Sequence, residues 1–182
     1  MRRNGVLMHL SSLPGDQGIG TMGKSAHEFV DFLEKAGQSV WQLLPVVPTS
    51  YGDSPYASFS TFAGNPYFID LDLLAEDGLL KEGEYETVDW GGDPEHVDYG
   101  ALYNNRTKVL RKAASRLLEN KPDEYYEFLE ENYDWLPDYA LFMALKDKNG
   151  GKSWLEWEDD ERNYGTEAVT RLAEQYREDV DF

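Results

Sequence analysis

The order of apolar and polar positions divides the chain into a short β/α part and a longer helical part. Residues 5–10 form a continuous apolar run, and residues 40–44 form a second one that ends at Pro45. Between them, apolar residues recur at helical spacing from Ala26 to Ala36, and Gly37 stands where a left-handed residue ends a helix. This pattern predicts a β-α-β unit with parallel strands that are buried on both faces.

The segment after the second run predicts a long loop and then a third strand. Residues 45–66 form a loop of about 20 residues, a length that in compact domains is usually functional or disordered. It carries Tyr51, Tyr56, Phe59 and Phe62, and aromatic residues favour an ordered surface. Residues 67–71 combine β-prone side chains with a polar end, so we expect a strand there.

From residue 73 onward the pattern predicts mainly helices. A weak helix to Asp77 and an acidic, turn-rich stretch at 78–97 precede the longer helices. We expect these at 103–119, from Pro122, from Pro137, and from about Thr166 to beyond Arg177, with the apolar run 140–145 central. Three strands cannot close a parallel sheet, so residues 73–182 resemble an insertion, and the chain is expected to be the N-terminal piece of a longer α/β protein.

The composition of the chain excludes several classes of functional site and partner. The 182 residues include 17 Lys and Arg, 35 Asp and Glu, and no cysteine, for a net charge of −18. Disulfides, thiolate metal sites and thiol catalysis are excluded, and binding to nucleic acid or anionic membranes is disfavoured by charge repulsion. No apolar run is long enough to span a bilayer or to act as a signal peptide, so we expect a cytoplasmic protein. The acidity indicates adaptation to a high-salt cytoplasm or an ordinary acidic protein.

The loop at 45–66 has the composition of a sugar-binding surface. Aromatic rings alternate with hydroxyl and carboxylate side chains just after the carboxyl end of a predicted parallel strand. Rings can stack on the apolar face of a pyranose while short polar groups bind its hydroxyls. A loop held in place by its own aromatic residues remains the alternative.

Longer strings resemble one family, the 4-α-glucanotransferases, also known as amylomaltases or disproportionating enzymes. They are HLSSLPG (9–15), GIG (18–20), WQLLP (41–45), YGDSPY (51–56), SFS (58–60), AGNPY (63–67), IDL (69–71), VDYGALY (97–103) and DYALFMALK (138–146). The resemblance implies a (β/α)8 TIM barrel with a mainly helical inserted subdomain, the barrel being incomplete in this chain. Residues 1–72 would be its first β/α units and 73–182 the insertion, with the chain ending before the catalytic strands.

The resemblance also implies an activity and a set of site residues. The family transfers α-1,4-glucan segments between maltodextrins, so the expected partners are maltose, maltotriose and longer maltodextrins, without a metal or cofactor. Tyr56 matches the ring beside the cleavage point and Ser54 a nearby hydroxyl contact. Asp53 is also a candidate substrate-binding residue, although capping or bracing the loop is its favoured role. Tyr51 and Tyr103 match an aromatic pair that forms a second glucan-binding groove.

The catalytic carboxylates of the family are not in this chain. Its Arg-x-Asp-His, Ala-Glu-Asp-Leu-Gly and Thr-His-Asp-Asn contexts are missing, so the chain alone is expected to be inactive. Glu76 lies in a superficially similar string and is interpreted as a solvated helix end, and residues 158–161 as an exposed charged face. His9 is interpreted as a satisfied core residue. A non-catalytic glucan-binding protein and an α-glucan hydrolase remain alternatives.

Overall fold

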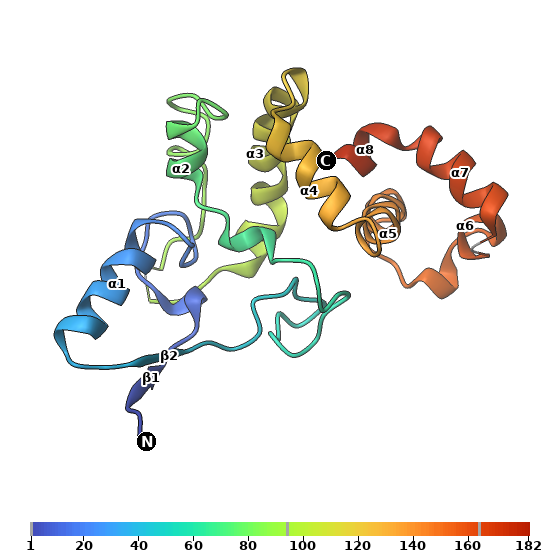
Figure 1. Cartoon of the computed structure of the whole chain (residues 1–182). Coiled ribbons are helices and arrows are strands. Elements are labelled where there is room, and N and C mark those ends of the chain that lie inside the picture. The colour runs from blue at the N-terminus through green and yellow to red at the C-terminus, as the bar shows by residue number, and fades with distance from the viewer. Residues whose placement is uncertain (1, 94, 164) are drawn as a thin grey trace. The chain divides into compact units, whose positions relative to one another are not determined.

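The computed structural model describes residues 2–93, 95–163 and 165–182 (Figure 1). The chain forms two compact units, Met1–Ala113 and Ala114–Phe182, and helix α3 (Tyr99–Glu119) contributes residues to both. This division differs from the expected boundary between residues 72 and 73. That boundary concerns which residues would be inserted into a barrel, and it stays a prediction.

The predicted β-α-β unit is present at the start of unit 1. Strand β1 (Gly5–Leu7) pairs in parallel with β2 (Val40–Gln42), and helix α1 (Lys24–Lys35) connects them. Gly5 lies opposite Val40, where a Cβ atom would come within 2.3 Å of the Val40 carbonyl oxygen. Gly37 has a φ of 68°, which confirms the predicted left-handed end of the helix.

The expectation that both strands are buried on two faces is wrong for this structure. Leu7 is 59% exposed and Val40 is 38% exposed. Among the described residues the sheet has only two strands, so no neighbouring strand flanks β1 or β2 on its outer edge. Apolar composition predicted the extended conformation correctly, but burial depends on how many strands assemble.

The predicted third strand at residues 67–71 is also wrong. A short 3-10 helix (Pro66–Phe68) is followed by helix α2 (Leu71–Glu76). Asn65 accepts a hydrogen bond from the backbone N–H of Tyr67, and Asp70 accepts two from the first turn of α2. Asx side chains that bind nearby backbone groups compete with strand pairing and stabilise helix starts instead. Helix α2 therefore begins two residues before the predicted weak helix.

Unit 1 is organised around an apolar cluster and one buried cation. The 3-10 helix Leu10–Ser12, the two loops around residues 13–23 and 78–97, and α3 contribute to it. Arg106 on α3 is 0% exposed and lies within this cluster, with its guanidinium 5.4 Å from the centre of the Trp90 ring. The buried apolar members are Leu10, Leu13, Ile19, Phe68, Leu71, Leu80, Tyr85, Trp90, Leu102, Val109, Leu110 and Ala113.

The guanidinium of Arg106 binds backbone carbonyls from two irregular segments. It donates to the oxygens of Gln17 (3.0 Å), Tyr67 (3.1 Å) and Ile69. The side chain of Gln17 in turn accepts a hydrogen bond from the backbone N–H of Leu71 at 2.9 Å. Burial lowers the pKa of Arg106 to about 10, so the side chain is still charged at neutral pH. These hydrogen bonds satisfy carbonyls that no strand or helix pairs.

Unit 2 is helical, as predicted. It contains α4 (Asp123–Glu131), α5 (Leu136–Lys148), a 3-10 helix (Trp154–Glu156), α6 (Asp159–Arg162), α7 (Thr166–Gln175) and α8 (Arg177–Asp181). The apolar run on α5 is central, because Leu141 and Leu145 are buried together with Trp157 and Leu172. The helix expected to continue from Thr166 beyond Arg177 is instead divided at Tyr176 into α7 and α8.

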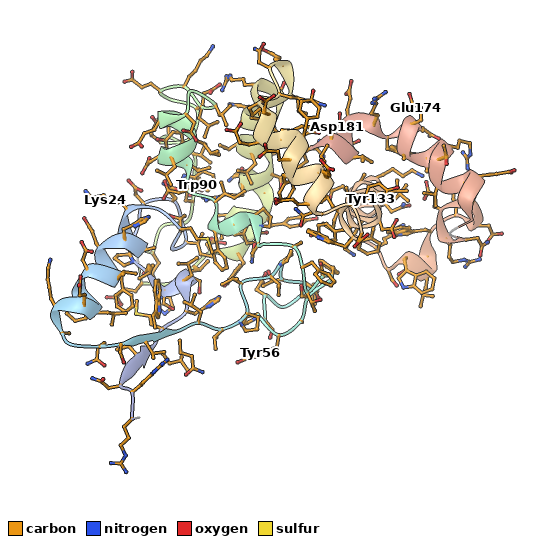
Figure 2. The ribbon with its side chains drawn as sticks, viewed as in Figure 1. Lys24, Tyr56, Trp90, Tyr133, Glu174 and Asp181 are labelled. Atoms are coloured by element: carbon orange, nitrogen blue, oxygen red, sulfur yellow. The ribbon has the colours of Figure 1, made fainter. Side chains whose placement is uncertain are left out.

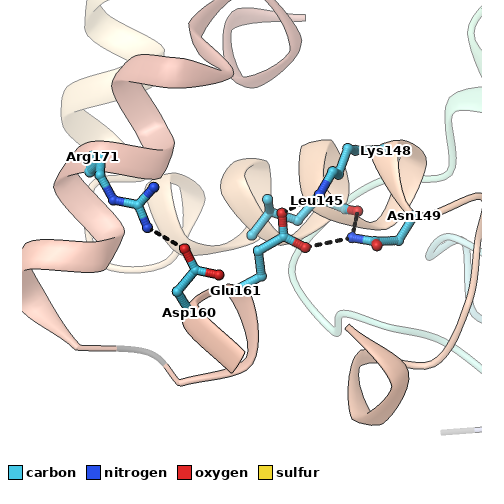
Figure 3. Close-up of polar contacts among 6 residues, drawn as sticks. All are labelled: Leu145, Lys148, Asn149, Asp160, Glu161 and Arg171. Atoms are coloured by element: carbon cyan, nitrogen blue, oxygen red, sulfur yellow. Dashed lines mark hydrogen bonds and ion pairs between the residues drawn. The ribbon is translucent and has the colours of Figure 1, made fainter. Parts of the chain in front are cut away.

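The acidic run at residues 158–161 is not a uniformly exposed face. Glu161 is buried and accepts hydrogen bonds from Lys148 Nζ at 2.5 Å and Asn149 Nδ2 at 2.9 Å, which attach α6 to the end of α5 (Figure 3). Asp160, by contrast, is exposed and pairs with Arg171 at 2.6 Å. The charge run predicted solvent exposure correctly for Asp160 and wrongly for Glu161, because the last turn of α5 supplies two donors for Glu161.

Glu161 and Asp160 allow the effect of burial on stability to be compared at two neighbouring carboxylates. We expect Glu161→Ala to lower the free energy of unfolding by about 2 kcal/mol, since it removes the carboxylate that binds the Lys148 ammonium and one of the two acceptors of the Asn149 amide. Asp160→Ala removes an exposed pair and is expected to cause no measurable change. Urea unfolding followed by far-UV circular dichroism measures both, and equal effects would contradict the burial argument.

Candidate functional site

The loop at residues 45–65 has no helix or strand but is held by its own hydrogen bonds. The backbone N–H of Asn65 donates to the carbonyl of Val46 at 2.9 Å, which joins the two ends of the loop. Near the tip, Ser50 N–H donates to the Ala57 carbonyl at 2.9 Å. Such internal bonds are typical of compact surface loops whose ends lie close together. The loop therefore presents a defined surface, in agreement with the sequence pattern.

Three of the predicted sugar contacts, Tyr51, Ser54 and Tyr56, lie on this surface. Tyr51 is fully exposed. Tyr56, which Figure 2 labels, is 75% exposed on the same loop. The hydroxyl of Ser54 accepts a hydrogen bond from the Tyr56 backbone N–H at 3.3 Å, so this serine also fixes the turn that carries the Tyr56 ring. Exposed aromatic rings on a defined turn are what stacking on a pyranose requires.

Asp53 lies at the bend of the loop. Its backbone adopts a left-handed φ of 54°, a conformation that aspartate tolerates better than most side chains, and its N–H donates to the Ser50 carbonyl at 3.0 Å. Burial raises the pKa of the Asp53 carboxyl, so this group is partly withdrawn from water. Its negative charge also raises the pKa values of Tyr67 and Tyr99, after the larger effect of burial. These interactions support the expected bracing role, which stays a prediction.

Tyr103 belongs to a cluster of tyrosines that the sequence pattern did not reveal. The rings of Tyr67 and Tyr99 lie 6.5 Å apart, and Tyr99 and Tyr103 are one helical turn apart on α3. Burial, then Asp53, Tyr103 and Tyr99, raise the pKa of Tyr67, whereas Arg106 lowers it. Tyr103 itself is 68% exposed. Asp53 of the loop and Tyr103 of α3 thus both act electrostatically on the same tyrosine, and the i, i+4 spacing of Tyr99 and Tyr103 on α3 was the available signal.

A separate groove lies between residues 11–19 and 90–97. Its volume is about 450 Å³, and its polar lining includes Ser12, Asp16, Asp93 and His96. None of the predicted sugar contacts lines it. Within the described ranges, no group of three or more His, Asp or Glu side chains is placed to hold a metal ion, and no helix is long and apolar enough to cross a membrane.

His9 lies at the carboxyl end of β1, at the same edge from which the loop leaves β2. Its ring packs edge-on against Phe68, with centroids 5.5 Å apart. Within the described part of the chain, its Nδ1 atom is buried and has no hydrogen-bond partner. The interpretation of His9 as a packed residue agrees with this contact, but the expectation that it is satisfied is wrong. Burial lowers the pKa of His9 from its ordinary value of 6.5.

The partly buried imidazole of His9 predicts a pH dependence of stability. Because the pKa of His9 is lower in the folded than in the unfolded chain, unfolding takes up a proton as the pH falls below 6.5, and the free energy of unfolding should fall with it. His9→Gln is expected to flatten this decline between about pH 7.5 and pH 5.5. His27→Gln, at an exposed position on α1, is the matched control and should leave the slope unchanged. Urea unfolding at each pH measures it, and parallel slopes for wild type and His9→Gln would contradict the assignment.

Taken together, the fold and the loop define a protein that begins with a parallel β-α-β unit and presents aromatic rings beyond its strand ends. Comparison with known proteins identifies the family to which the chain belongs. Residues 8–182 match the family model described as 4-alpha-glucanotransferase, and the chain belongs to this family.

Individual relatives agree with this assignment. The chain is 50% identical over 175 residues to the 4-alpha-glucanotransferase of Clostridium butyricum and 44% identical over 185 residues to that of Thermus thermophilus. Its fold matches the amylomaltase from Streptococcus agalactiae in complex with acarbose, with a TM-score of 0.92, 43% identity and 100% of this chain covered. The chain spans 36% of the Clostridium and Thermus proteins and 37% of the amylomaltase chain.

Proposed function

We propose that this chain is the N-terminal glucan-binding portion of a 4-α-glucanotransferase with a (β/α)8 barrel. The observation that carries the proposal is the exposed, hydrogen-bonded loop with Tyr51, Ser54 and Tyr56, in a chain that matches the family from residue 8 to its last residue. The solved amylomaltase was found with acarbose, which supports a carbohydrate ligand. The proposed substrates are maltotriose and longer α-1,4-linked maltodextrins.

The chemistry of retaining glycosyl transfer separates the groups that break the bond from those that bind the glucan. Retaining transfer needs a carboxylate nucleophile and a second carboxylic acid about 5 Å apart. In this proposal those groups belong to a later part of the enzyme, and the residues described above contribute binding and orientation. Tyr56 holds the sugar beside the cleavage point, and Tyr51 and Tyr103 hold a longer glucan further away. Binding energy from such remote contacts places the scissile bond against the reacting groups.

The first test concerns the ring beside the cleavage point. In the complete transferase, Tyr56→Ala is expected to lower disproportionation of maltotriose by at least about tenfold, which corresponds to about 1.4 kcal/mol of positioning lost. Tyr56→Phe keeps the ring and is the matched control, with activity close to wild type. Glucose release and longer maltodextrin products are quantified by anion-exchange chromatography. Unchanged kinetics in Tyr56→Ala would refute this role, and products limited to hydrolysis would favour an α-glucan hydrolase.

The second test separates long from short substrates. Tyr51→Ala and Tyr103→Ala should each weaken binding of long maltodextrins about fivefold, since one stacked ring contributes about 1 kcal/mol. Turnover of maltotriose should change little, because a trisaccharide does not reach both regions in this proposal. Tyr133→Ala, at a 74% exposed tyrosine in unit 2, is the control and should change neither. Affinity electrophoresis in soluble starch measures binding, and equal loss on both substrates would count against a second groove.

A further inference from the structure

Arg106 joins the helix that carries Tyr103 to both segments of unit 1 that precede it. Its guanidinium donates to Gln17 in the first segment, and to Tyr67 and Ile69 in the segment that directly follows the loop at 45–65. Three carbonyls bound by one planar group fix the direction of approach as well as the distance. This one side chain therefore links α3 directly to the backbone that follows the loop.

A buried charge at this position stabilises unit 1 only through the hydrogen bonds that it makes. Arg106 is completely buried, and burying a cation is unfavourable even when hydrogen bonds compensate for it. Its Nε atom is buried without a hydrogen-bond partner in the described part of the chain, so the compensation is incomplete. An apolar side chain could fill the space beside Trp90, but it would leave these three carbonyls without their donor. The guanidinium supplies both the donors and a directional link between α3 and the chain at residues 67–69.

One end of this link is the backbone of Tyr67, whose ring lies near that of Tyr99. Tyr103 precedes Arg106 by three residues, so the two side chains leave neighbouring positions of α3. Tyr67, whose carbonyl Arg106 binds, packs near Tyr99 and also lies within the electrostatic influence of Asp53 on the loop and of Tyr103. Any shift of α3 against residues 67–69 would therefore change the spacing between Tyr103 and the loop that carries Tyr51.

We propose that Arg106 is a positioning residue that sets the distance between Tyr103 on α3 and the loop at 45–65, and thereby the affinity for long α-1,4-glucans. The inference rests on the proposed glucan-binding function and deepens it. Arg106 does not touch the glucan; it acts through the backbone of residues 67–69 and through the register of α3.

Arg106→Lys tests this role because lysine keeps the charge but loses the planar fork. In the complete transferase, affinity for long maltodextrins should fall at least about fivefold, the effect of losing one stacked ring, while kcat/KM for maltotriose changes less than about twofold. Leu80→Ala, which opens the same apolar cluster but leaves the Arg106 donors in place, is the control for general destabilisation and should leave the ratio of long- to short-glucan affinity unchanged. Equal loss on both substrates in Arg106→Lys, or the same selective loss in Leu80→Ala, overturns the proposal.

A distance measurement gives an independent readout. These 182 residues contain no cysteine, so within them spin labels attach only at Tyr51→Cys and Tyr103→Cys. The distance distribution between the labels should broaden when Arg106→Lys is added, and an unchanged distribution overturns the proposal. If Arg106→Lys does not fold, Arg106→Met takes its place, and failure of both to fold overturns the proposal because arginine is then required for the fold itself.

Tyr103→Ala, measured in parallel, separates this inference from the proposed function. If Tyr103→Ala weakens binding of long glucans and Arg106→Lys does not, only the role of Arg106 fails. If Tyr103→Ala has no effect, the second groove fails, and the positioning role fails with it.

Discussion

Unit 1 depends on a buried guanidinium more than on its sheet. Its two strands are three residues each, whereas residues 13–23 and 65–70 are largely irregular and need partners for their backbone groups. Arg106 supplies donors to both segments. Asp70 complements it, because this carboxylate caps α2, accepts a hydrogen bond from Thr21 at 2.5 Å, and lies close enough to support the charge of Arg106. A compact unit thus forms around one polar network embedded in apolar side chains.

The hydrogen bonds of Arg106 also connect the two parts of the candidate site, which are the loop at 45–65 and helix α3. The hydrogen bond from the Asn65 N–H to the Val46 carbonyl closes the base of the loop. The chain that follows the loop binds Arg106 through the Tyr67 carbonyl. Tyr51 and Tyr56 project from the loop, and Tyr103 projects from α3. Aromatic rings that stay exposed while the backbone beneath them is fixed can bind a flexible sugar chain with little loss of their own conformational freedom. In the proposed function this segment orients the glucan and leaves bond cleavage to carboxylates elsewhere.

Local sequence signals predicted most helices but not the path of the chain between them. Gly37, Pro122 and Pro137 marked helix ends correctly, because capping and proline geometry act within one turn. Residues 67–71 were predicted as a strand from their β-prone side chains, yet Asn65 and Asp70 direct the backbone into helical turns. Glu161 was predicted to be exposed because its acidic neighbours are, and only the end of α5 supplies the two donors that bury it.

The sequence by itself determined the family strings, the parallel β-α-β start and the aromatic loop, because these depend on residue type and short-range spacing. Tertiary structure decided which side chains meet. Arg106 and Tyr67 are far apart in the chain, and no periodicity signals that a charged residue on an amphipathic helix will turn inward to bind carbonyls. Burial of such a group depends on whether distant backbone atoms are left without partners, and that is known only when the chain has folded around it.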